Sequence, residues 1–114
     1  MPDFASLATI EDPERRLRRA LTEMYAWYDT VEPELALIFR DAPLVAAGAE
    51  ALAETTAKVA AFADSLTRGR PRRKSVRAAI GHALEFETWR SLVRRQGLSR
   101  GQAVDAMLRL VASV

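Results

Sequence analysis

Apolar side chains recur at helical spacing in the first third of the chain, from residue 12 onward. Asp12 can accept hydrogen bonds from free backbone N–H groups, and Pro13 suits a first helical position because no N–H is needed there. This pattern predicts an amphipathic helix over about 12–29. Trp27 is offset from its apolar stripe, and we expect it to face a neighbouring element outside the main core. The stripe consists of Leu17, Leu21, Met24 and Tyr28.

Prolines divide the segment that follows. Pro33 marks the start of a short predicted helix over about 33–41, and Pro43 ends it, because the residue before a proline disfavours helical angles. Residues 44–66 are rich in alanine, which favours helix, and their larger apolar side chains form one narrow seam. The first ten residues show no strong period, so we expect a loose end or the remnant of a helix.

A basic break separates the two halves of the chain. Residues 67–74 contain both glycine and proline, which stop the preceding helix. The next predicted helix, over 75–96, is apolar on more than one face, so we infer burial on two sides, one of which a second subunit could cover. Gly97 suits a C-terminal cap, and Ser99 with Gln102 forms a capping box for a last helix over 99–113.

The whole pattern predicts a single all-α domain over residues 1–114, with five helices and no sheet. A content of 49% hydrophobic and 28% charged residues is typical of a globular protein rather than a disordered one. The chain has no cysteine, which excludes disulfides, thiolate metal sites and cysteine nucleophiles. It also has no apolar run of membrane-spanning length and no signal-peptide pattern, so we expect a cytoplasmic protein without a membrane partner.

Charge is distributed unevenly along the chain. Residues 1–57 carry five Arg/Lys and eleven Asp/Glu, whereas residues 58–114 carry twelve and four, which gives net charges of −6 and +8. A basic half is compatible with nucleic-acid binding. Mutual attraction of the two halves, or simple solvation of charged faces, is the favoured interpretation.

Candidate catalytic chemistry is sparse. His82 is the single histidine, and no carboxylate cluster surrounds it at metal-ligand spacing, so a hydrogen-bonded core residue is the favoured interpretation and no metal site is expected. The chain contains no glycine-rich phosphate loop and no nucleophile elbow. We therefore expect neither an enzyme nor a cofactor.

The basic break also resembles the core of an AT-hook, in which an extended Arg-Gly-Arg-Pro strand enters the minor groove of A·T-rich DNA. Binding of DNA by this loop is an alternative to the favoured interpretation, which is a solvated connection between helices. The candidate nucleic-acid residues are Arg68, Arg70, Arg72, Arg73 and Lys74.

Two ordered stretches resemble the C-terminal domains of one branch of TetR-type transcriptional regulators. The first comprises residues 12–17 (DPERRL) through Leu21, with 25–28 (YAWY) and 40–43 (RDAP). The second comprises residues 81–92 (GHALEFETWRSL), then 96–99 (QGLS) and Ala103. Together the two stretches span about residues 12–113, in the order that such domains show.

The resemblance implies a helical ligand-sensing and homodimerisation domain. The last two helices, 75–96 and 99–113, would pair with those of a second subunit as a four-helix bundle. The implied interface residues are Ile80, Leu84, Trp89, Leu92, Val104, Met107, Leu108 and Val111. An apolar or aromatic effector would occupy a pocket among the earlier helices, and its candidate residues are Leu21, Tyr25, Tyr28, Phe39, Phe62 and Phe86.

The chain departs from the TetR pattern in one respect, since residues 1–114 contain no helix-turn-helix segment. The resemblance therefore implies that operator DNA would be read only through a head that is not present in this chain. Two alternatives remain open beside a TetR-type sensor: a small DNA-associated protein that uses the basic loop, and a purely structural helical interaction module. The large aromatic residues fit either a ligand cavity or a plain core.

Overall fold

The centre of the fold is the long helix α2, Pro13–Asp41. A computed structural model of the chain describes the backbone of residues 1–41 and 46–114, and their side chains except those of 39, 41, 46–49, 51 and 52. Every secondary-structure element in this part is helical, which confirms the all-α prediction. The other elements are α1 (Phe4–Ala8), α3 (Ala46–Leu66), α4 (Lys74–Leu84), α5 (Phe86–Trp89), the π-helix η1 (Arg90–Arg95) and α6 (Arg100–Ser113).

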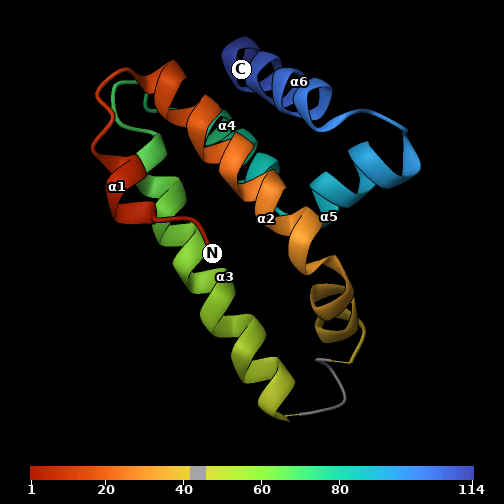
Figure 1. Cartoon of the computed structure of the whole chain (residues 1–114). Helices are drawn as coiled ribbons and strands as arrows, with labels where there is room; N and C mark the ends of the chain where they lie inside the picture. Colours follow the sequence, from red (N-terminus) through yellow and green to blue (C-terminus); the bar gives the residue numbers. More distant parts are fainter. Residues whose placement is uncertain (42–45) are drawn as a thin grey trace.

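Helices α2 and α4 form the middle of the fold. Helix α2 contacts α1, α3, α4, α5 and α6, and α4 contacts both α3 and α6. Figure 1 shows α3 and α6 on opposite sides of α2, with α4 behind it. None of the described helices is both long enough and apolar enough to cross a lipid bilayer.

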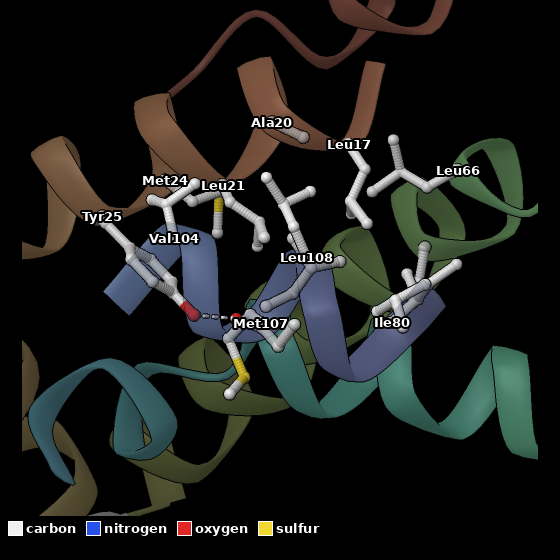
Figure 2. Packing of buried hydrophobic residues seen from close by; sticks show 14 of the residues in the cluster. Leu17, Ala20, Leu21, Met24, Tyr25, Leu66, Ile80, Val104, Met107 and Leu108 are labelled. Carbon is white, nitrogen blue, oxygen red and sulfur yellow. Dashed lines mark hydrogen bonds between the residues drawn. The ribbon is translucent and has the colours of Figure 1, made fainter. Parts of the chain in front are cut away.

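The hydrophobic core lies where α2 faces α4 and α6. Figure 2 shows Leu21 and Met24 of α2 directed toward Val104 of α6, with Leu108 and Ile80 close by. All of these side chains are buried. Complete burial of one such side chain stabilises the fold by about 1.5–3 kcal/mol. The apolar stripe that predicts α2 therefore also holds it in place.

The predicted helix end before Pro33 is wrong. The segments predicted separately as 12–29 and 33–41 form one helix, α2, with Pro33 inside it. An internal proline removes one N–H donor and presses against the carbonyl group four residues earlier, here that of Asp29. The helix continues past Pro33 because Leu35 packs against the core and α2 contacts α3 and α5. Tertiary packing thus outweighs the local cost of the proline.

The prediction of one helix over 75–96 is also wrong. Glu85 has an extended backbone, with φ −68° and ψ 141°, so α4 ends at Leu84 and α5 begins at Phe86. Beyond α5 the chain continues as the π-helix η1. Such helices are rare in proteins, and π-helical turns are often found at functional sites.

Two tyrosines of α2 bond to the carbonyl groups at this break. The hydroxyl of Tyr25 donates to the carbonyl oxygen of Ala83 at 2.5 Å, and the hydroxyl of Tyr28 donates to that of Leu84. Figure 2 shows the ring of Tyr25 extending from α2 with its hydroxyl in this hydrogen bond. These donors lie 58 and 56 residues earlier in the chain, so the periodicity of 75–96 contains no sign of the break.

The predicted caps are confirmed. The N–H of Arg15 donates to the carboxylate of Asp12 at 2.8 Å, and Ser99 forms the full capping box with Gln102. Gly97 has the positive φ, 78°, of a C-terminal cap. Of the two expectations for the first ten residues, a loose end or the remnant of a helix, the structure shows a helix: the short α1 packs on α2 and α3.

Candidate functional site

An apolar cavity of about 380 Å³ opens between the second half of α2, the middle of α3 and the α4–α5 junction. Ligand sites in proteins typically occupy about 300–1,000 Å³ and have mostly apolar walls with a few polar groups. The cavity matches both criteria. Its lining residues are Trp27, Tyr28, Leu35, Ile38, Thr55, Thr56, Val59, Ala60, Ala63, Arg77, Gly81, Leu84, Glu85, Phe86 and Glu87.

Aromatic rings form one wall of the cavity. The centroids of Trp27 and Tyr28 lie 5.5 Å apart, and those of Tyr28 and Phe86 lie 5.4 Å apart in an edge-to-face arrangement. Behind them Trp89 is fully buried. The centroid of its ring lies 5.6 Å from that of Phe86 and 6.0 Å from that of Tyr28. Such ring pairs add about 0.5–1.5 kcal/mol each beyond the area that they bury. The aromatic wall is therefore preformed.

Three charged residues lie among these lining residues. The guanidinium of Arg77 on α4 pairs with the carboxylate of Asp64 on α3. The carboxylate of Glu87 pairs with Arg90 at 2.9 Å and with Arg95 at 3.6 Å. Glu85 forms no such pair with an arginine or lysine of the described chain.

The structure brings only part of the predicted pocket together. Tyr28 and Phe86 line the cavity. Leu21, Tyr25 and Phe62 do not: they are buried in the core, and the side chain of Phe62 stacks on Phe4 of α1 with centroids 4.3 Å apart. The remaining candidate, Phe39, has its side chain outside the described part of the chain.

Most lining residues were not foreseen from the sequence. Trp27 gave a usable signal, because its offset from the apolar stripe of α2 placed it outside the main core. The sequence predicts Leu35 and Ile38 in a separate helix, so it does not indicate that they lie on the same face as Trp27. Val59 and Thr56 line the cavity only because α3 packs beside the continued α2.

The predicted dimer residues mostly fill the core of the single chain. Of the eight, Leu92 is half-buried and the other seven are buried within one molecule. The two apolar faces of 75–96 are covered by α2, α3 and α6 of the same chain. These seven side chains are therefore not available to a second subunit in this arrangement, and homodimerisation stays a prediction. The seven are Ile80, Leu84, Trp89, Val104, Met107, Leu108 and Val111.

The AT-hook-like loop is folded back on the N-terminal segment. Arg68 donates to the carbonyl oxygen of Ala8 at 2.8 Å, and Arg70 donates to that of Pro13 at 3.2 Å. Gly69 between them has φ 82°, and a Cβ atom there would lie 2.7 Å from Cγ of Pro13. The Arg-Gly-Arg-Pro segment is thus a tight turn, not the extended strand that a minor groove accepts.

Arg16 is a third arginine that connects the basic loop to the N-terminal segment, and it does so from a buried position. Its guanidinium is fully buried and donates to the carbonyl oxygens of Ile10, at 2.9 Å, and of Arg68. Burial lowers the pKa of Arg16, and the nearby charges of Arg68 and Arg70 lower it further. Three arginines therefore hold the α1–α2 connection against the α3–α4 loop. The remaining nucleic-acid candidates, Arg72, Arg73 and Lys74, are exposed beside a polar cleft.

The described part of the chain offers candidate metal ligands only singly or in pairs. It contains no group of three or more His, Asp or Glu residues that could hold a metal ion. His82, expected in the core, is exposed instead, and its Nδ1 lies 3.3 Å from the hydroxyl of Thr88. The cavity is therefore the feature of this part of the chain with the clearest capacity to bind a ligand.

Comparison with known proteins gives no relative. No protein-family model, no curated protein and no solved structure matches this chain significantly.

Proposed function

We propose that this chain is the ligand-sensing domain of a TetR-type transcriptional regulator, with a regulatory rather than a catalytic role. The observation that carries the proposal is the apolar cavity of about 380 Å³ between α2, α3, α4 and α5. The resemblance of residues 12–43 and 81–103 to such domains implies an effector pocket among the same early helices. A preformed aromatic wall supports an apolar or aromatic effector over a sugar or a phosphate.

The position of the cavity supports a mechanism in which binding of a ligand changes the packing of the helices. Leu84, Glu85 and Phe86 line the cavity at the α4–α5 break, and Tyr28 both lines it and bonds to the carbonyl of Leu84. A ligand that displaces the Tyr28 ring would change the packing of α2 against α4. In an intact regulator, such a shift would alter the spacing of the two DNA-binding heads.

Binding of N-phenyl-1-naphthylamine, an uncharged fluorescent aromatic compound, tests the cavity. Gly81 lines it, and a Cβ atom there would meet no atom within 4 Å, so a Gly81→Phe side chain has room to enter. We expect fluorescence enhancement with the unmodified chain and its loss in Gly81→Phe. Ala78→Phe is the matched control, because Ala78 is exposed on the same helix and does not line the cavity.

Two results would contradict this proposal. The first is no enhancement with the unmodified chain, which would favour a purely structural helical module. The second is equal binding by Gly81→Phe and the unmodified chain, which would place the probe elsewhere.

Self-association through the last helices belongs to the same proposal. With most of the expected interface residues in the core, the larger half-buried apolar side chains of residues 90–113 include Leu92, Val93, Leu98 and Leu110. We expect light scattering to give the mass of a dimer and Leu110→Glu to give a monomer. Arg109→Glu, at the exposed neighbouring position, serves as the control. A monomer at micromolar concentration of the unmodified chain would count against the TetR-type architecture.

A further inference from the structure

Glu85 lines the cavity, and its carboxylate has no ion pair with an arginine or lysine of the described chain. Among the described residues, no arginine or lysine nitrogen lies within 4.0 Å of it, and its one ion-pair neighbour is Nδ1 of His82, 4.0 Å away. A histidine carries charge only when it is protonated. The other charged lining residues, Arg77 and Glu87, are already paired with Asp64 and with arginines. Glu85 is therefore the charged lining residue of the described chain whose carboxylate has no arginine or lysine partner.

The backbone places Glu85 at the cavity, and its side chain is exposed. Glu85 is the extended residue between α4 and α5, and both of its neighbours line the cavity. The hydrogen bond from Tyr28 to the carbonyl of Leu84 holds the break on its α4 side. Burial raises the pKa of the Tyr28 hydroxyl, and the negative charge of Glu85 raises it further, which agrees with a carboxylate close to the aromatic wall.

The aromatic wall itself favours positive charge. The faces of aromatic rings carry partial negative charge and attract cations, most strongly where water is excluded. Trp27, Tyr28 and Phe86 line the same cavity as Glu85, and the guanidinium of Arg90 already lies 5.4 Å from the centroid of the Phe86 ring. An anionic ligand would meet these rings and Glu85, and the guanidinium of Arg77 is already engaged by Asp64.

We infer that the cavity selects an organic cation, a molecule with an apolar or aromatic body and an alkylammonium group that lies between the aromatic wall and Glu85. This inference rests on the proposed function, since it names the chemical class of the effector. It assigns Glu85 as the residue that sets the charge preference, and the apolar walls as the source of most of the binding energy.

The test uses N-phenyl-1-naphthylamine as the neutral reporter and phenyltrimethylammonium as a cationic competitor, whose uncharged isostere is tert-butylbenzene. We expect both competitors to displace the reporter. In Glu85→Gln the affinity for the cation should fall about tenfold, equivalent to about 1.4 kcal/mol, whereas the affinities for the two neutral compounds should stay unchanged. Raising the salt concentration should weaken the cation alone.

Glu14→Gln is the control, because it removes one negative charge at the opposite end of α2, outside the cavity. It should leave all three affinities unchanged. The sulfonated analogue of the reporter, 8-anilinonaphthalene-1-sulfonate, extends the test to an anion, and we expect it to bind more weakly than the neutral compound.

The outcomes separate the two proposals. If the neutral reporter does not bind, the proposed ligand-binding function fails, and the inference about charge fails with it. If the reporter binds but Glu85→Gln leaves the cation affinity unchanged, the inference is overturned and the ligand-binding function stands. Tighter binding of the sulfonate than of the neutral reporter would also overturn the inference.

Discussion

The hydroxyl of Tyr25 on α2 donates a hydrogen bond, at 2.5 Å, to the carbonyl oxygen of Ala83, two residues before the break between α4 and α5. In a continuous helix this carbonyl would accept from the N–H group of Glu87. The extended conformation of Glu85 ends that pattern, and the tyrosine hydroxyl takes its place. Tyr28 bonds to the carbonyl of Leu84 in the same way. The break next to the cavity therefore depends on two side chains of another helix.

Removal of either hydroxyl should destabilise the fold. Tyr25→Phe keeps the buried ring but leaves the carbonyl of Ala83 without its partner, and an unsatisfied buried polar group costs about 1–3 kcal/mol. We expect a loss of this size in the free energy of unfolding for Tyr25→Phe and for Tyr28→Phe, measured by urea denaturation. Thr30→Val removes an exposed hydroxyl from the same helix and should change it by less than about 0.5 kcal/mol. An unchanged value for Tyr25→Phe would contradict this account.

Alkaline pH should destabilise the fold through the same tyrosines. Burial raises the pKa of both hydroxyls above the ordinary value of about 10. The folded chain thus keeps protons that the unfolded chain releases, so this contribution to stability is complete below about pH 10 and is lost as the pH rises through the folded-state pKa. Denaturation curves at increasing pH should show a decline that is shallower in the double variant Tyr25→Phe/Tyr28→Phe. Equal slopes would show that other groups cause the decline.

Gly69 should not tolerate a side chain. Its φ of 82° is unfavourable for a residue with a side chain, and an added Cβ atom would lie only 2.7 Å from Cγ of Pro13. A left-handed conformation alone costs a non-glycine residue about 1–2 kcal/mol, so we expect Gly69→Ala to lower the melting temperature clearly. Gly101→Ala is the matched control, because Gly101 lies inside α6 with no atom within 4 Å of a new Cβ. That change should stabilise the chain by up to about 1 kcal/mol, and a similar effect of the two substitutions would refute the argument.

Arg68 and Arg72 should behave differently although both belong to the basic loop. Arg68 bonds to the carbonyl of Ala8, whereas the exposed Arg72 has no hydrogen bond or ion pair within the described chain. A hydrogen bond to a charged group contributes about 1.5–3 kcal/mol, and less where water has access. We expect Arg68→Ala to destabilise the chain by about 1 kcal/mol and Arg72→Ala to be neutral within about 0.5 kcal/mol.

The AT-hook alternative makes a different prediction for the arginines of this loop. If the loop bound A·T-rich duplex DNA as an extended strand, Arg68→Ala and Arg70→Ala would abolish a salt-dependent mobility shift while leaving stability unchanged. Loss of stability without any DNA binding by the unmodified chain would support the folded turn.

Local signals in the sequence predicted much of the fold but less of the site. The caps at Asp12, Ser99 and Gly97 were predictable because capping depends on residues within a few positions of one another. Tyr28 and Phe86 were predictable as pocket residues, and the offset of Trp27 was visible. The contribution of Leu35 was not, because the continuation of α2 through Pro33 depends on packing against α3 and α5.

By itself, the sequence determined that this chain is helical, where most helices begin and which stripe of each is apolar, because these properties arise from short-range periodicity and backbone chemistry. The tertiary structure decided where helix geometry is broken and which apolar faces remain open. Tyr25 and Tyr28 stabilise a break that lies 56 to 58 residues away in the sequence. The apolar faces predicted to form a dimer interface are covered by α2, α3 and α6 of the same chain. These features depend on contacts between residues that are distant along the chain, and the short-range periodicity of the sequence does not indicate such contacts.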